Sequence, residues 1–90
     1  HTFHVTIKIE GPINNKNDFV MDFFDIDTIF NKTVFDKLDH KYLNDIDGLQ
    51  SPTTENLAKW IWNTLIKQLS ILKEVHVFEN DVYGCIYKGD

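Results

Sequence analysis

The strict alternation of residues 2–10 is the pattern that most limits how this chain can fold. Apolar side chains take every second position and polar side chains the positions between, with Phe3, Val5, Ile7 and Ile9 on one side and Thr2, His4, Thr6, Lys8 and Glu10 on the other. Because alternate residues of a strand share a face, this pattern predicts a half-buried strand. Such a strand is stable only within a larger sheet whose apolar face is covered. The rest of the chain must therefore supply further strands and the elements that cover this face.

Two later stretches have the spacing of helices. Apolar residues recur every three or four positions over residues 25–38, which predicts a first helix. A second apolar face runs over residues 57–69, with Ser51 or Thr53 as the candidate N-cap. The periodicity lapses over residues 39–51, so we expect a structured polar loop there, of the kind that often carries function.

The end of the chain is predicted to form a hairpin. Residues 75–79 alternate, Asn80-Asp81 is a plausible two-residue turn, and a last strand follows over residues 82–87. The order strand, helix, helix, strand, strand predicts an α+β fold with two helices on one face of an antiparallel sheet. We expect residues 1–90 to form one domain whose start is incomplete, because the chain opens at His1 inside a strand and without a methionine.

Composition and charge exclude several classes of protein. The chain has nine lysines, no arginine and 14 acidic residues, for a net charge of −5, so we expect no nucleic-acid partner. No run of about 18 apolar residues is present, so we expect no membrane span. The single cysteine, Cys85, fits a reducing compartment and predicts a cytoplasmic location. A 90-residue chain without an internal disulfide is expected to gain stability from partner subunits or a metal.

The dipeptide Asp39-His40 is the sharpest local feature that could carry chemistry. An aspartate that holds one ring nitrogen of a histidine fixes its tautomer and raises its basicity, which suits proton transfer. The alternative is a solvated histidine favoured by the dipole at the C-terminal end of a helix. The dipeptide alone favours this alternative.

Other polar residues give weaker signals. His1 and His4 alone cannot form a zinc site, since three or four ligands are needed. His4 and His76 are interpreted as exposed strand residues, and Cys85 as a buried, inert thiol. Glu79, at the end of an apolar strand, either marks the strand end or accepts paired hydrogen bonds from a planar heterocycle.

Five short segments, in order, carry more specific patterns: His1-Thr2-Phe3, Met21-Asp22-Phe23, Leu38-Asp39-His40-Lys41-Tyr42-Leu43-Asn44, Pro52-Thr53-Thr54-Glu55-Asn56-Leu57-Ala58 and Val75 to Glu79. They resemble, in the same order, the end of the HGHxF/Y zinc motif and the MDF, LDHxxLN, PTxENLA and VxVxE motifs of the 6-pyruvoyltetrahydropterin synthase and 6-carboxytetrahydropterin synthase family. Five ordered matches are far more specific than any single one, and they cover nearly the whole chain.

The resemblance implies a fold, an assembly and a substrate. The fold would be a T-fold, a four-stranded antiparallel sheet backed by two helices, with its first strand missing from this chain. Subunits would assemble through sheet edges into trimers and then hexamers. Each subunit would bind one Zn²⁺ through three histidines and take a dihydroneopterin triphosphate substrate at a subunit interface.

The resemblance also assigns roles to single residues. His1 would be a zinc ligand, Asp39 and His40 would transfer protons, and Glu79 would anchor the pterin ring. Thr53 and Thr54 would line the pterin site. The other two zinc histidines and the catalytic cysteine of the family precede the position of His1, and Cys85 lies in the wrong element to replace that cysteine.

The function implied is that of a zinc-dependent lyase. We expect it to convert 7,8-dihydroneopterin triphosphate to 6-carboxy-5,6,7,8-tetrahydropterin, a step of queuosine biosynthesis, and compact loops favour this reaction mildly. One alternative is a 6-pyruvoyltetrahydropterin synthase of the tetrahydrobiopterin pathway. Another is a catalytically silent T-fold subunit that binds pterin or only assembles. A small α+β interaction domain with coincidental matches is the least favoured interpretation.

Overall fold

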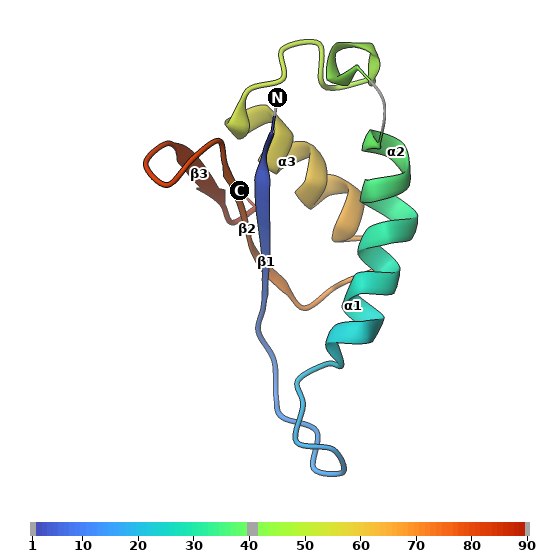
Figure 1. Ribbon diagram of the computed structural model, residues 1–90. Helices are drawn as coiled ribbons and strands as arrows, with labels where there is room; N and C mark the ends of the chain where they lie inside the picture. Colours follow the sequence, from blue (N-terminus) through green and yellow to red (C-terminus); the bar gives the residue numbers. More distant parts are fainter. Residues whose placement is uncertain (1, 40–41, 90) are drawn as a thin grey trace.

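The chain folds into two layers, a sheet and a layer of helices (Figure 1). The computed structural model describes residues 2–39 and 42–89. Within these ranges the sheet has three antiparallel strands in the order β1-β2-β3. The strands are β1 (His4–Ile9), β2 (Leu72–Phe78) and β3 (Gly84–Tyr87), and the helical elements are α1 (Phe23–Phe30), the π-helical segment η1 (Asn31–Phe35), α2 (Asp36–Leu38), the 3-10 turn η2 (Leu43–Asp45) and α3 (Thr54–Leu65).

The register of the sheet explains the alternation in the sequence. Val5 pairs with Val77, and Val77 pairs with Cys85, so these three side chains form one row across the sheet. This row faces the helices, and both Val75 and Val77 are completely buried. The α+β prediction is therefore confirmed, with strands that are shorter or shifted by a few residues at their ends.

The first helical column begins two residues earlier than the apolar spacing predicted. Asp22 is its N-cap, and its side chain accepts a hydrogen bond from the backbone N–H of Phe24 at 2.9 Å. The capped helix then continues through η1 and α2 to Leu38. The apolar spacing placed the start of this helix at residue 25, and the side-chain cap at Asp22 explains why it begins earlier.

The second helix, α3, begins at the expected PTxENLA segment. Thr53, and not Ser51, is the N-cap, because its side chain accepts a hydrogen bond from the N–H of Asn56 at 3.1 Å. The Asn56 side chain donates to the carbonyl oxygen of Ser51 at 2.8 Å and so ties the preceding loop to the helix. The helix ends at Leu65, earlier than the predicted apolar face, and a turn carries the chain on to Leu69.

The core lies between the sheet and α3, which packs against β2 and β3. Its buried apolar members are Val34, Leu49, Leu57, Ala58, Ile61, Leu65, Leu69, Leu72, Val75 and Val77. Leu49 is 0% exposed although it lies in the stretch predicted to be a polar loop. A lone apolar residue has no periodicity, so the sequence pattern gave no sign that this loop is fixed to the core.

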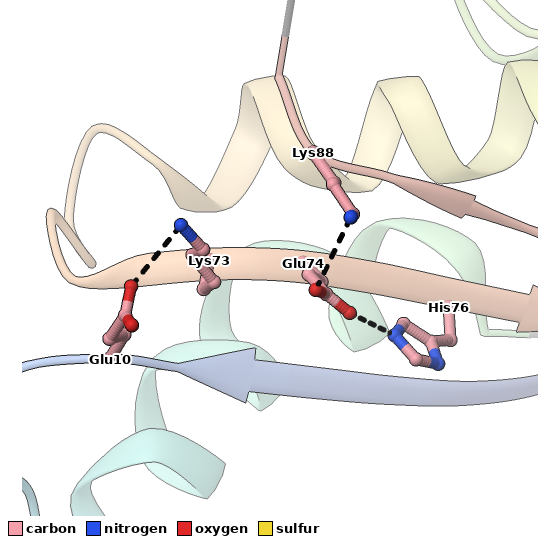
Figure 2. Close-up of polar contacts among 5 residues, drawn as sticks. All are labelled: Glu10, Lys73, Glu74, His76 and Lys88. Atoms are coloured by element: carbon pink, nitrogen blue, oxygen red, sulfur yellow. Dashed lines mark hydrogen bonds and ion pairs between the residues drawn. The ribbon is translucent and has the colours of Figure 1, made fainter.

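Charged side chains cross-link the face of the sheet that points away from the helices (Figure 2). His76 Nε2 lies 2.7 Å from Glu74 Oε1, and Lys88 Nζ lies 3.9 Å from Glu74 Oε2. The hydrogen bond from His76, aided by the charge of Lys88, holds the pKa of Glu74 below its usual value. His76 is therefore half-buried and hydrogen-bonded, whereas we expected an exposed strand residue.

The connection between β2 and β3 is longer than the two-residue turn that we predicted. It covers residues 79–83, and Asn80 Oδ1 accepts hydrogen bonds from the N–H groups of Val82 and Tyr83, both at 2.8 Å. The Asn side chain thus replaces the backbone bonds of a tighter turn. The prediction overlooked this capacity of Asn80 and so began the last strand two residues too early.

Gly84 is required where the Phe78 ring crosses over β3. A Cβ atom at position 84 would overlap that ring and would lie 2.6 Å from the carbonyl oxygen of Val77. Gly84→Ala should therefore lower the free energy of unfolding by about 1–3 kcal/mol, the usual cost of overpacking. Urea unfolding measures this loss. Gly11→Ala is the matched control, because a Cβ there meets only the Val20 and Ile71 side chains at 3.4 and 3.7 Å; an equal loss in both variants would contradict the prediction.

Candidate active site

The segments that carry the predicted site residues meet at one end of the fold. The start of β1, the end of α2, the start of α3 and the connection from β2 to β3 all lie at the upper end of the molecule in Figure 1. Asp39 directly follows α2, Thr53 directly precedes α3, and Glu79 directly follows β2. Folding therefore gathers residues that are up to 40 positions apart in the sequence, from Asp39 to Glu79.

Asp39 contributes to the wall of a cavity of about 790 Å³ between β1 and the helical column. Its lining is mainly apolar, with Phe3, Val5, Phe30, Val34, Phe35, Leu38, Asp39, Tyr42, Leu43, Asn44, Pro52, Leu57 and Ile61. This volume lies within the range of about 300–1,000 Å³ that is usual for small-molecule sites. Asp39 supplies a carboxylate to a mainly apolar wall that also includes Tyr42 and Asn44, and a carboxylate beside a binding cavity can take part in proton transfer.

The hairpin presents Glu79 in a fixed position. The Glu79 N–H donates to the carbonyl oxygen of Tyr83 at 2.9 Å, which extends the pairing of β2 and β3 by one further pair. Asn80 holds the other side of the turn through its two accepted bonds. The Glu79 residue itself is exposed. A carboxylate held in this way can accept two parallel N–H bonds from a planar ligand.

The start of α3 touches β3 through Thr54 and Cys85. Thr54 is buried, and its hydroxyl donates to Glu55 Oε1 at 2.6 Å, which lowers the pKa of the Glu55 carboxyl. Burial raises the pKa of the Cys85 thiol, while the Thr54 hydroxyl beside it has the opposite, smaller effect. A raised pKa favours the less reactive thiol form, but Cys85 is half-buried and not buried as we expected.

The described residues do not bring all the predicted site groups into one cavity. Asp39 lines the large cavity, but Glu79, Thr53 and Thr54 do not. Thr53 caps α3 from an exposed position, and Thr54 faces Glu55. His1 and His40 lie outside the described residues.

A metal site is likewise not formed by the described residues alone. Across residues 2–39 and 42–89, no three His, Cys, Asp or Glu side chains come close enough to share a metal ion. The predicted zinc ligand His1 falls outside these ranges. The described side chains alone therefore do not supply a complete set of zinc ligands.

No helix within the described ranges is both long and apolar enough to cross a membrane.

The fold and the grouped segments define an α+β domain of the T-fold type, with acidic residues at one end of its sheet. The family model described as 6-pyruvoyl tetrahydropterin synthase matches residues 1–90. The chain belongs to this family, which is a family of lyases. The resemblance inferred from the five motifs is thus confirmed.

Curated relatives carry several enzyme names. The chain is 33% identical over 94 residues to a 6-pyruvoyl tetrahydrobiopterin synthase of Dictyostelium discoideum, an alignment that covers all of this chain and 70% of the relative. It is 37% identical over 87 residues to a dihydroneopterin monophosphate aldolase of Pyrococcus furiosus, covering 93% of this chain and 72% of the relative. It is 37% identical over 81 residues to a putative 6-carboxy-5,6,7,8-tetrahydropterin synthase of Archaeoglobus fulgidus, covering 90% of this chain and 67% of the relative. The chain thus spans about two thirds of the length of such relatives.

Proposed function

We propose that this chain is the greater part of an enzyme that acts on the side chain of 7,8-dihydroneopterin triphosphate and yields 6-carboxy-5,6,7,8-tetrahydropterin. The observation that supports this proposal best is the gathering of Asp39, Thr53 and Glu79 at one end of a family-typical fold. Each of these residues lies within a family motif, and the motifs converge in space only once the chain is folded.

In this proposal, Glu79 binds the ring and the Asp39-His40 pair does the chemistry. The pyrimidine edge of a pterin offers adjacent N–H donors, which match the two oxygens of the exposed Glu79 carboxylate. Thr53, at the start of α3, adds a hydroxyl beside the ring. The proposed role of the Asp39-His40 pair is to move a proton to or from the substrate side chain, and Asp39 lies at the wall of the cavity.

The proposed site is completed by residues beyond the described ones. Asp39 lines the cavity and Glu79 does not, so the proposed site is one that neighbouring subunits complete at the interface of a trimer or hexamer. His1 is proposed to be one ligand of a Zn²⁺ ion, which would polarise substrate oxygens when bound. We further propose that the enzyme acts in the cytoplasm, in line with its single free thiol.

A second candidate reaction yields 6-pyruvoyltetrahydropterin. It is favoured by the relative of that name from Dictyostelium discoideum, whose alignment covers the whole of this chain. Both reactions use the same substrate, the same pterin-binding carboxylate and the same proton-transfer pair. The two candidates therefore differ in the product and not in the roles assigned to this chain.

Product identification decides between the candidates. The protein of full natural length is incubated with 7,8-dihydroneopterin triphosphate, the products are separated and weighed by mass spectrometry, and metal content and sedimentation are measured on the same sample. We expect 6-carboxytetrahydropterin, one zinc per subunit and an oligomer. A 6-pyruvoyl product selects the second candidate. Tight pterin binding without turnover would mean a catalytically silent subunit, and a monomer at micromolar concentration would contradict the interfacial site.

A further inference from the structure

Tyr83 is a large aromatic side chain that the structure leaves exposed beside Glu79. Its exposed fraction is 69%, although the hairpin that carries it is fixed by several hydrogen bonds. The bond from the Glu79 N–H to the Tyr83 carbonyl oxygen makes these two residues cross-strand partners. Partners of this kind project from the same face of a sheet, with Cβ atoms about 4.5–5.5 Å apart.

The strand alternation places this face toward the start of α3. The inward row of the hairpin runs through Val77 and Cys85, and Glu79 and Tyr83 form the next pair along the same row. Cys85 is the residue that meets Thr54. Tyr83 is therefore paired with Glu79 across the two strands, and it lies two positions before Cys85, the residue that meets the start of α3.

The backbone around Tyr83 is held before any ligand arrives. Asn80 Oδ1 accepts the Tyr83 N–H, and the Phe78 ring covers Gly84 on the opposite face. The ring of Tyr83 itself has few contacts, since most of its surface is exposed. Because the backbone that carries the open aromatic ring and the neighbouring carboxylate is already ordered, less conformational entropy is lost when the ring binds a flat molecule.

We propose that Tyr83 is a binding residue that stacks on the bicyclic ring of the pterin held by Glu79, and so selects two-ring over one-ring heterocycles. This inference rests on the proposed function, because it assumes that Glu79 binds the pyrimidine edge. The carboxylate accepts hydrogen bonds from the N–H edge, and a single pyrimidine ring has a similar edge. The tyrosine ring stacks on the flat face, and a fused two-ring system has a larger face for stacking than a single ring.

Equilibrium binding of two probes to the full-length protein tests the inference. Neopterin is titrated by its fluorescence, and isocytosine, a single ring with a similar donor edge, is measured by competition against it. Tyr83→Ala should raise the Kd for neopterin about tenfold, equal to about 1.4 kcal/mol, and the Kd for isocytosine about two- to threefold, in line with the smaller overlap. Tyr83→Phe should retain wild-type affinity for both probes.

Two further variants separate this inference from the function on which it rests. Glu79→Gln should weaken both probes to a similar extent. Val82→Ala, which truncates a similarly exposed apolar side chain in the same connection between β2 and β3, should change neither Kd. If Glu79→Gln weakens neopterin but Tyr83→Ala does not, or if Tyr83→Phe loses as much affinity as Tyr83→Ala, stacking is overturned and the proposed function survives. If the wild-type protein binds neither probe, both proposals fail.

Discussion

Replacing His40 with alanine, or Asp39 with asparagine, should lower turnover of 7,8-dihydroneopterin triphosphate by about 100-fold or more, the usual size of a general acid-base contribution. Pterin affinity should stay nearly unchanged, because neither residue is proposed to hold the ring. Asn at position 39 keeps the size of the side chain but can no longer stabilise a charged imidazole. Steady-state kinetics together with neopterin titration separates the two effects: kcat should fall while the Kd stays.

Asp36→Asn provides the matched control for this experiment. Asp36 is an exposed aspartate at the start of α2, three residues before Asp39, which directly follows this short helix. Its replacement removes an equal charge from the same region without touching the proposed pair. Turnover within twofold of wild type is expected for the control. Near-normal turnover in both His40→Ala and Asp39→Asn would contradict the proposed proton-transfer role, and the LDHxxLN segment would then only mark the end of a helix.

Most of the fold follows from patterns that act over a few residues. The alternation of Phe3, Val5 and Ile7 predicted β1 because burial on one face of a pleated strand imposes a period of two. The N-cap at Thr53 was predictable in the same way, since a hydroxyl before a run of helix formers satisfies an otherwise unpaired N–H. Such signals are local, and the structure confirms them.

The features that the sequence analysis missed depend on single side chains with distant or unusual partners. Leu49 is anchored by the core although its neighbours are polar, and Asn80 lengthens the turn through bonds that a two-residue template does not contain. Glu74 and His76 form their hydrogen bond only because both side chains project from the face of β2 that points away from the helices. None of these contacts produces a repeating pattern of residues in the sequence, so they are seen only in the folded chain.

The candidate site shows the same division. The motifs identified Asp39 and Glu79 as residues of interest, but their distance from one another depends on the topology of the sheet and on the helical column that flanks β1. Both residues lie at the same end of the fold. Asp39 lines the apolar cavity, whereas Glu79 lies at the start of the connection between β2 and β3. Tyr83 was not singled out in the sequence, because an aromatic residue in a predicted strand normally indicates core packing. The exposure of its side chain is what points to a binding role, and this exposure is known only from the folded structure.

Glu79→Gln should weaken pterin binding more than it slows the chemistry. A carboxylate that accepts two N–H bonds from the pyrimidine edge forms a charge-assisted bidentate pair, whereas an amide offers one acceptor and turns a donor toward the second N–H. Losing one hydrogen bond to a charged group costs about 1.5–3 kcal/mol, which corresponds to a Kd about 10- to 150-fold higher. Titration of the full-length variant with neopterin measures this change, and kcat at saturating substrate should fall by much less.

Asp81→Asn is the matched control for Glu79→Gln, because Asp81 is an exposed acid in the same connection between β2 and β3. It removes the same charge from the hairpin, so a purely electrostatic effect of the turn on the ligand would appear in both variants. The competing interpretation is that Glu79 only closes the hairpin beside Asn80. In that case, Glu79→Gln changes the unfolding temperature slightly and leaves the Kd of neopterin unchanged, and this result would falsify the assignment of Glu79 as the pterin anchor. The hydrogen bond that closes the hairpin comes from the Glu79 backbone and is retained by glutamine, so we expect the opposite result: an unchanged unfolding temperature and a raised Kd.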